Sequence, residues 1–283
     1  MIQTMATEYD VVELCEAFEV SKSGYYAWSQ RRPSQRDVAN QALLQKIRQV
    51  HQESRRTYGS PRITHALRAR GERPGKNRVA RIMRQNTIQG AQKARFKPRT
   101  TDSRHDLPVS PNRLAGIQEV QRCDQAWVTD ITYISTLEGW MYLAAFMDLK
   151  SRTIKGWALK DHMKSELVEE AFLQAVFRHS PAPGLIVHSD RGSQYASHRF
   201  SSLLRHHQAL GSMSAKGHCY DNAAMESFWA TLKTELSIRR PFSTKAEARL
   251  AIFDYIEIFY NRLRLHSSLG YRSPLDFEAK CPA

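Results

Sequence analysis

The sequence has only four cysteines among its 283 residues, and no two of them form a C-x-x-C pair. Cys15, Cys123, Cys219 and Cys281 lie far apart along the chain. A disulfide-rich scaffold needs a denser set of cysteines, and a cysteine-rich zinc site needs closely spaced pairs. The sequence therefore predicts neither a disulfide framework nor a zinc site of this kind, which fits a protein of the reducing cytoplasm.

Long apolar runs are also missing. The longest uninterrupted run covers residues 140–147 and is followed by Asp148. A helix that crosses a bilayer needs about 20 apolar residues. The N-terminus carries Glu8, Asp10 and Glu13, where a secretory signal would need a basic start and an apolar stretch. We therefore expect a cytoplasmic protein that has no membrane partner.

Positive charge is present in excess, and it is unevenly distributed. The chain carries 42 Lys and Arg against 28 Asp and Glu, which gives a formal net charge of +14. Residues 1–110 hold 21 basic against 10 acidic side chains, whereas residues 111–283 hold 21 against 18. Such a concentrated field suits a polyanionic partner, most commonly a nucleic acid. On charge alone, a basic surface that only keeps the protein soluble is the alternative.

The N-terminal third has the apolar spacing and the capping residues of helices. Residues 1–54 are predicted to form a helical region in which Ser21 or Ser23 caps a short helix after a tight turn. This pair of helices fits a helix-turn-helix and an ordinary helical hairpin equally well. Residues 55–106 are predicted to form a second, basic helix-turn-helix-like DNA-binding domain together with its linker. In this domain Ser60 is predicted to cap one helix, with Pro61 at its first position, and Gly71 is predicted to end it.

Basic side chains are densest in this second region, because residues 55–104 contain 15 Lys and Arg and only two acidic residues. Arg78, Arg81 and Arg84 are spaced three apart and predict a stripe along one helix. Arginine forks can reach phosphates and guanine edges, although a charge stripe is often only a solvated face. From residue 91 to 106 the periodicity is lost, which predicts an extended linker that becomes ordered on DNA. The linker side chains expected to contact DNA are Lys93, Arg95, Lys97 and Arg99.

The second half of the chain changes character. Residues 125–135, 140–149 and 153–159 are rich in β-branched and aromatic side chains and predict an antiparallel meander. A helix from Ser165, a short strand at 185–188 and further helices follow. Strands that come first, with helices interleaved later, indicate a mixed α/β sheet. We assign residues 107–240 to this α/β core and residues 241–283 to a C-terminal helical extension.

Three acidic residues occupy unusual places in this core. Asp130 lies within a strand, Asp190 follows the strand at 185–188, and Glu226 lies in the first turn of a later helix. Carboxylate oxygens suit Mg²⁺, and a two-metal site needs few protein ligands. Lys233 lies two turns beyond Glu226 and could hold a DNA phosphate there. Taken singly, Asp130 could be a buried hydrogen-bond acceptor, Asp190 a turn residue, and Glu226 a complement to the helix dipole.

These residues lie within a series of motifs in a fixed order. The first is VTDITY at 128–133, the second is HSDRGSQY at 188–195, and the third is DNAAMESFW at 221–229 followed by Leu232 and Lys233. Near the C-terminus, YNR at 260–262 and HSSLGY at 266–271 form a further motif, the terminal signature. Two more motifs lie upstream of the core, SGYYAW at 23–28 and YGSPRI at 58–63. In these motifs the chain resembles bacterial insertion-sequence transposases of the DDE class. It is similar to the product of the second of two overlapping reading frames, whose core is related to retroviral integrases.

The resemblance implies an RNase H-like core, a mixed five-stranded sheet with flanking helices, preceded by an all-α helix-turn-helix DNA-binding region. It implies that Asp130, Asp190 and Glu226 bind two Mg²⁺ ions, which Mn²⁺ can replace, and that no zinc is bound. These ions would take part in two successive reactions. The first is hydrolysis of the DNA at the ends of the element, and the second is attack of the freed DNA 3′-hydroxyl on target DNA. His188, Asn222 and Trp229 are expected to support the metal ligands or to pack near them, and simple packing is the favoured interpretation for Trp229.

The resemblance also implies partners. They are double-stranded DNA, as the terminal inverted repeats and the target, a second copy of the chain on that DNA, and the protein of the first reading frame. The expected location is the bacterial nucleoid. Two other functions stay open at this stage. One is a DNA-binding partner or regulator of the fused transposase, against which the intact acid triad argues. The other is an RNase H-like nuclease without strand transfer.

Overall fold

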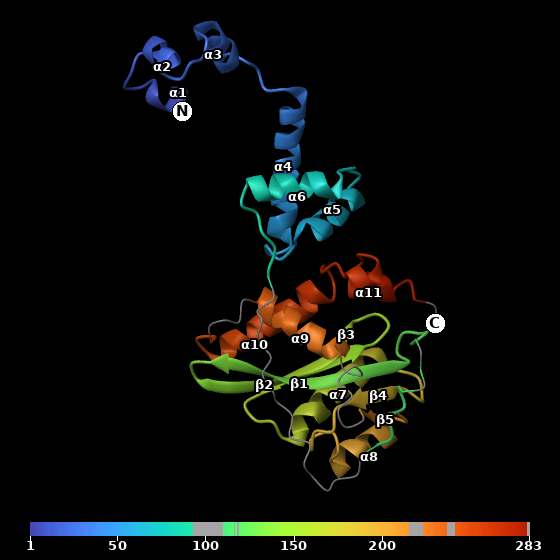
Figure 1. Cartoon of the computed structure of the whole chain (residues 1–283). Helices are drawn as coiled ribbons and strands as arrows, with labels where there is room; N and C mark the ends of the chain where they lie inside the picture. The colour runs from blue at the N-terminus through green and yellow to red at the C-terminus, as the bar shows by residue number, and fades with distance from the viewer. Residues whose placement is uncertain (93–109, 116, 118, 215–222, 237–240, 282–283) are drawn as a thin grey trace.

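A computed structural model describes residues 1–92, 110–115, 117, 119–214, 223–236 and 241–281. Figure 1 shows three parts that follow one another along the chain: a small group of N-terminal helices, a unit of three helices, and an α/β core that is covered by the C-terminal helices. Within the described residues, no helix is both long and apolar enough to cross a membrane.

The N-terminal group consists of α1 (Ile2–Met5), α2 (Val11–Ala17) and α3 (Lys22–Ser29). The Asp10 side chain caps α2 by accepting a hydrogen bond from the Val12 amide. Ser21, and not Ser23, caps α3 by accepting from the Gly24 amide. These caps satisfy amides that have no partner within their own helix, which fixes where such short helices start.

The three-helix unit is built from α4 (Gln35–Glu53), α5 (Ser60–Ala69) and α6 (Lys76–Gln85). Their buried faces meet in one apolar cluster, to which Ile47, Ile63 and Val79 contribute fully buried side chains. α4 starts after its cap Ser34, and α5 begins at Ser60 with Pro61 in its first turn. α4 therefore packs with α5 and α6, although the sequence analysis groups it with residues 1–54.

The core contains one five-stranded sheet: β1 (Ala126–Thr136), β2 (Gly139–Asp148), β3 (Ile154–Lys160), β4 (Ile186–Ser189) and β5 (Leu210–Met213). The strand order is β3-β2-β1-β4-β5. β1, β2 and β3 pair antiparallel, as the meander predicts, while β4 pairs parallel to β1 and β5 parallel to β4. The predicted mixed five-stranded sheet is confirmed.

Helices cover both faces of this sheet (Figure 1). α7 (Ser165–His179) and α8 (His198–His206) lie on one face, and α9 (Ala223–Glu235) and α10 (Lys245–Phe253) lie on the other. Because successive residues of a strand point to opposite faces, Trp127 of β1 joins the cluster with α7, whereas Val128 joins the cluster with α9. Asp130, two residues after Val128, therefore lies on the α9 side of β1.

The C-terminal extension continues from α10 into a π-helical segment, Asp254–Tyr260, and ends with α11 (Pro274–Glu278). It returns to the start of β1, where the ammonium group of fully buried Lys155 contacts Asp124 at 2.9 Å and Glu278 at 2.8 Å. Close by, the structure joins Cys123 and Cys281 in a disulfide with a Cα–Cα distance of 6.5 Å. The sequence does not predict this pair, although a single disulfide is not the framework that the cysteine spacing excludes. A separation of 158 residues along the chain says nothing about their distance once the extension folds back.

The three-helix unit docks on the C-terminal extension. The Tyr58 hydroxyl donates to the Leu263 carbonyl at 3.2 Å and accepts from the Leu265 amide at 2.7 Å. The His65 ring stacks on Tyr271 with 3.6 Å between ring centroids and an interplanar angle of 8°. Tyr58 of the YGSPRI motif thus contacts the segment between the two parts of the terminal signature, although some 200 residues separate them.

Gly156 of β3 lies against α7 so closely that no larger residue fits. A Cβ atom at this position would lie 2.4 Å from the Ala171 carbonyl oxygen and 2.6 Å from the Ala175 amide nitrogen. Because both contacts are to backbone, the helix would have to move away from the sheet. We expect Gly156→Ala to lower the free energy of unfolding by about 3 kcal/mol, measured by urea denaturation. Gly75→Ala is the control, since a Cβ there meets open space; an equally small effect of both substitutions would contradict this packing.

Candidate active site

Asp130 and Asp190 lie side by side at the junction of two parallel strands. The register of β1 and β4 pairs Ala126 with Ile186 and Val128 with His188. Continued by two residues, the same register places Asp130 opposite Asp190, just past the end of β4. Neighbouring strands lie about 4.8 Å apart. The structure therefore brings these two sequence-predicted acids to the same level of the sheet.

α9 brings Glu226 to the same side of β1. Glu226 lies in the first turn of this helix, and its side chain is exposed. One turn later, Trp229 Nε1 donates a hydrogen bond to Asp130 Oδ2 at 3.0 Å. The other Asp130 oxygen accepts from the Ile131 amide at 2.8 Å. Trp229 thus fixes both the helix that carries Glu226 and the orientation of the Asp130 carboxylate.

Trp229 both packs in the core and contacts one of the three acids. Its ring packs with Phe228 and is only 6% exposed, as expected of a packing residue. The bond from its indole nitrogen to Asp130 corresponds to the alternative role, contact with one of the three acids. The available signal was the spacing, because a residue three positions after Glu226 lies on a neighbouring part of the helix surface.

The pKa of Asp130 is affected by the other two acids. Burial raises the pKa of Asp130 to about 7, with further upward contributions from Asp190 and, more weakly, from Glu226. Like charges that approach one another raise each other's pKa, and a bound cation reverses this effect. Lys233 also lies within reach of Asp130: burial lowers the pKa of Lys233, while the Asp130 charge opposes that shift.

The carboxylates are only partly organised for metal binding as they stand. Asp190 Oδ1 accepts a hydrogen bond from the Gly192 amide at 3.0 Å, which holds it in a tight turn. Over the described ranges, no group of three His, Cys, Asp or Glu side chains is arranged to hold a metal ion. The donor chemistry, three carboxylates that face a common region, nevertheless fits a hard divalent cation.

The strand behind these acids is supported by buried polar side chains. His188 is completely buried, and its ring nitrogens contact the hydroxyls of Ser212 at 2.8 Å and Ser214 at 3.0 Å. His188 therefore joins β4 to β5. Tyr195 and Thr129, which the sequence analysis did not select, form a buried hydroxyl pair at 3.1 Å next to the acids. Asn222, the other residue expected to support the ligands, lies outside the described residues.

The predicted arginine stripe lies on α6. Arg78 is half-buried, and its Nε donates to Asn40 of α4 at 2.9 Å, whereas Arg84 is exposed. Arg78 therefore also holds α6 against α4, and Arg81 and Arg84 are the more available cations of the stripe. The linker residues Lys93, Arg95, Lys97 and Arg99 lie outside the part of the chain that the structure describes.

Comparison with known proteins agrees with this architecture. Family models for an integrase core domain match residues 121–219 and 207–274, and a model for an HTH-like domain matches residues 39–96. The sheet with its flanking helices and the preceding helical unit thus define an integrase-core protein with an HTH-like domain.

Individual relatives show to which proteins the chain is similar over most of its length. The chain is 42% identical over 267 residues to the "Insertion element IS600 uncharacterized 31 kDa protein" of Shigella sonnei, covering 94% of this chain and 98% of the relative. It is 44% identical over 248 residues to the "Transposase for insertion sequence element IS904" of Lactococcus lactis, covering 88% and 98%. It is 38% identical over 281 residues to the "Transposase InsF for insertion sequence IS3A" of Escherichia coli, covering 99% and 97%. The chain belongs to the family of insertion-sequence transposases that carry an integrase core domain, and the predicted resemblance is confirmed.

Proposed function

We propose that this chain cuts DNA at the ends of an insertion sequence and joins those ends to target DNA, with Asp130, Asp190 and Glu226 as its catalytic residues. The register of β1 and β4 carries this proposal, because it sets two aspartates at one level of the sheet. The helix of Glu226 is bonded to the first of them through Trp229. Family membership supports the reaction class.

Asp130, Asp190 and Glu226 would hold two divalent ions, Mg²⁺ or Mn²⁺. When bound, such ions make an oxygen nucleophile available at neutral pH and stabilise the negative charge on the leaving oxygen. Burial is the main cause of the raised Asp130 pKa, but Asp190 and Glu226 add to the shift, and this local negative charge is what a cation would neutralise.

Other side chains would position the substrate and the acids. Trp229 keeps the Asp130 carboxylate turned toward α9, and the Gly192 amide holds the Asp190 carboxylate within the turn after β4. Lys233 lies seven residues after Glu226 on α9 and would hold a phosphate of the DNA beside the reacting bond. Hydrolysis and strand transfer are then the same displacement with water or a DNA 3′-hydroxyl as nucleophile. No covalent protein–DNA intermediate is needed.

The proposed partners follow from the reaction. Two element ends must be held together, so we infer that the chain forms oligomers on double-stranded DNA that carries the terminal inverted repeats. The protein of an upstream first reading frame is a further proposed partner. The proposed place of action is the bacterial cytoplasm, on nucleoid DNA.

The direct test is a joining assay. The purified chain would be incubated with Mg²⁺, a duplex that carries the inverted repeat flanking the gene, and a supercoiled plasmid as target. Covalent joining of the duplex to the plasmid is the expected result. Cleavage without joining would favour an RNase H-like nuclease, and binding without cleavage would favour a DNA-binding partner or regulator of a fused transposase.

DNA binding by α6 gives a separate prediction. We expect replacement of Arg78, Arg81 and Arg84 by Ala to weaken DNA binding. The slope of log K against log[salt] should fall by up to about 0.9 for each phosphate contact that is lost. Fluorescence anisotropy over a salt series measures both quantities. Arg205→Ala on α8, at the opposite end of the molecule in Figure 1, is the control. An unchanged slope in the triple variant would mean that the stripe is only a solvated face.

A further inference from the structure

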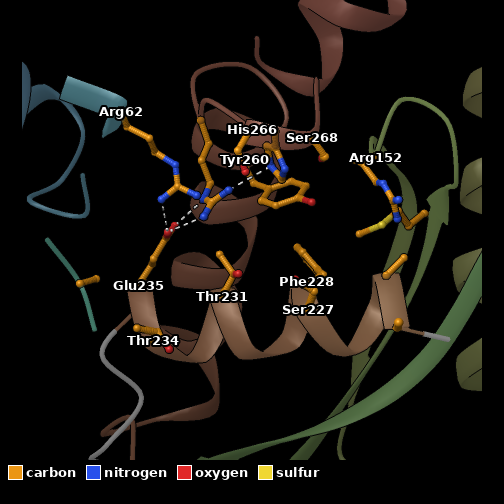
Figure 2. A pocket seen from close by; sticks show the side chains of 16 residues that line it. Arg62, Arg152, Ser227, Phe228, Thr231, Thr234, Glu235, Tyr260, His266 and Ser268 are labelled. Carbon is orange, nitrogen blue, oxygen red and sulfur yellow. Dashed lines mark hydrogen bonds and ion pairs between the residues drawn. The ribbon is translucent and has the colours of Figure 1, made fainter. Parts of the chain in front are cut away.

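A polar pocket lies along α9, where the three-helix unit, the core and the C-terminal extension meet. It has a volume of about 460 Å³, and Figure 2 shows its walls. α5 contributes Arg62, the turn between β2 and β3 contributes Arg152, and the C-terminal extension contributes Arg264 and His266. The floor is the face of α9 that carries Ser227 and Thr231.

The pocket has an excess of positive charge. Three arginines line it against one carboxylate, Glu235. Arg264 uses its fork to bind both oxygens of Glu235, each at 2.7 Å, and the nearest nitrogen of Arg62 lies 4.0 Å from the same carboxylate. Glu235 is therefore engaged mainly by Arg264. The charge of Arg152 is not compensated by any carboxylate of the pocket.

Arg152 is held in an unusual backbone conformation and points into this space. Its φ of 62° lies in the left-handed region, which costs an L-residue with a side chain about 1 kcal/mol and favours glycine or asparagine. Among the residues that the structure describes, no side-chain hydrogen bond or ion pair of Arg152 is found. Figure 2 shows it on the opposite side of the pocket from Arg62 and Glu235. An arginine at such a position, directed at a cavity, is available for an anionic ligand.

Hydroxyl groups complete the donor set. Ser227 and Thr231 on α9, and Ser267 and Ser268 in the terminal signature, line the pocket. Over the described ranges their hydroxyls make no hydrogen bond to the protein. Serine and threonine hydroxyls can each donate one hydrogen bond to a phosphate oxygen.

His266 adds a neutral donor. Burial lowers the pKa of His266 to about 3, and the charges of Arg264, Arg62 and Arg152 lower it further in the same direction. Its Nε2 must accept the hydrogen bond from Arg264 Nη1 at 3.1 Å, because a guanidinium has no acceptor. The single proton of the ring is therefore on Nδ1.

We propose that this pocket binds a backbone phosphate of the DNA that is being cut, with Arg152 as its main charged contact. The inference rests on the proposed function, since it assigns a second contact to the same substrate. Ser227 directly follows Glu226 on α9, so DNA held here would lie alongside the catalytic helix. Because Arg62 of α5 lines the opposite wall of the pocket, DNA held at Arg152 would also lie close to the three-helix unit, which would link binding by that unit to the core.

The test compares the native chain with Arg152→Gln, which keeps a polar side chain of similar length but removes the charge. Both proteins would be titrated by anisotropy with duplexes that carry the terminal inverted repeat, each with one phosphate replaced by a neutral methylphosphonate. We expect one position at which neutralisation weakens the native chain about tenfold and leaves Arg152→Gln unaffected. Equal losses in both proteins at every position would overturn the proposal.

The test includes a substitute variant and a titration with a second ligand. If Arg152→Gln does not fold by circular dichroism, Ser227→Ala takes its place under the same criteria, since alanine is favourable within a helix. Inorganic phosphate is titrated against thermal unfolding of both proteins. Protection of only the native chain, together with equal losses in the duplex series, would identify a free-phosphate site and overturn the assignment to DNA. Cleavage by Asp190→Asn would refute the proposed function without affecting this comparison.

Discussion

The Asp190→Asn variant is expected to bind the terminal duplex as tightly as the native chain and to cleave it about a thousandfold more slowly in Mg²⁺. Asparagine has nearly the same shape and can still accept the hydrogen bond from the Gly192 amide, so the turn after β4 should persist. What is lost is one of the negative charges that would hold the metal ions. A loss of about 4 kcal/mol of transition-state stabilisation corresponds to this factor.

Cleavage is measured on a labelled duplex under single-turnover conditions, and binding is measured by anisotropy on the same duplex. Asp161→Asn is the matched control, because Asp161 is an exposed aspartate of the core that pairs only with Lys245 among the described side chains. It should change neither quantity. Strand transfer by Asp190→Asn at the native rate would refute the assignment of the triad.

The Arg264→Met variant is expected to lose about 3–5 kcal/mol of unfolding free energy. The side chains of Arg264 and Glu235 are only 4% and 5% exposed, and the Tyr255 hydroxyl also donates to Glu235, at 2.8 Å. Removal of the guanidinium leaves a buried carboxylate without its main partner, which costs far more than the net contribution of the pair. Urea denaturation of both proteins measures the difference.

Two comparisons identify the cause of this loss. The double variant Arg264→Met with Glu235→Gln carries neither charge, and we expect it to be more stable than the single variant. Arg199→Met removes a guanidinium that is 66% exposed and pairs with Glu166 and Glu169, so it should cost no more than about 1 kcal/mol. If Arg264→Met and Arg199→Met were equally mild, the buried ion pair would not stabilise the junction of α9 with the C-terminal extension.

The sheet and most helices could be predicted because their signals are local. The meander of β1 to β3 follows from β-branched and aromatic runs with a short turn between them, and Ser21 and Pro61 mark helix starts through their own backbone chemistry. The disulfide of Cys123 with Cys281 could not be predicted in this way, because it depends on where the extension returns to the core.

The candidate site also has residues that the sequence predicts and contacts that it does not. Asp130, Asp190 and Glu226 can be selected from strand and helix positions, since a carboxylate within a strand or at its carboxyl end is unusual in one sequence. The bond from Trp229 to Asp130 and the contact of Tyr195 with Thr129 depend on how helices pack on the sheet. The spacing of Glu226 and Trp229 predicts only that both lie on neighbouring parts of one helix surface; it does not identify Asp130 or Thr129 as the partners.

By itself the sequence determined the order of the elements, the basic character of the first 110 residues and the three acids, because periodicity, capping and charge are properties of neighbouring residues. Only the tertiary structure decided that Tyr58 of YGSPRI docks on the C-terminal extension and that Arg62, Arg152 and Arg264 share one pocket. Such contacts join residues that are far apart along the chain. They form only when burial of apolar surface brings separate elements together, so their partners cannot be assigned from local pattern.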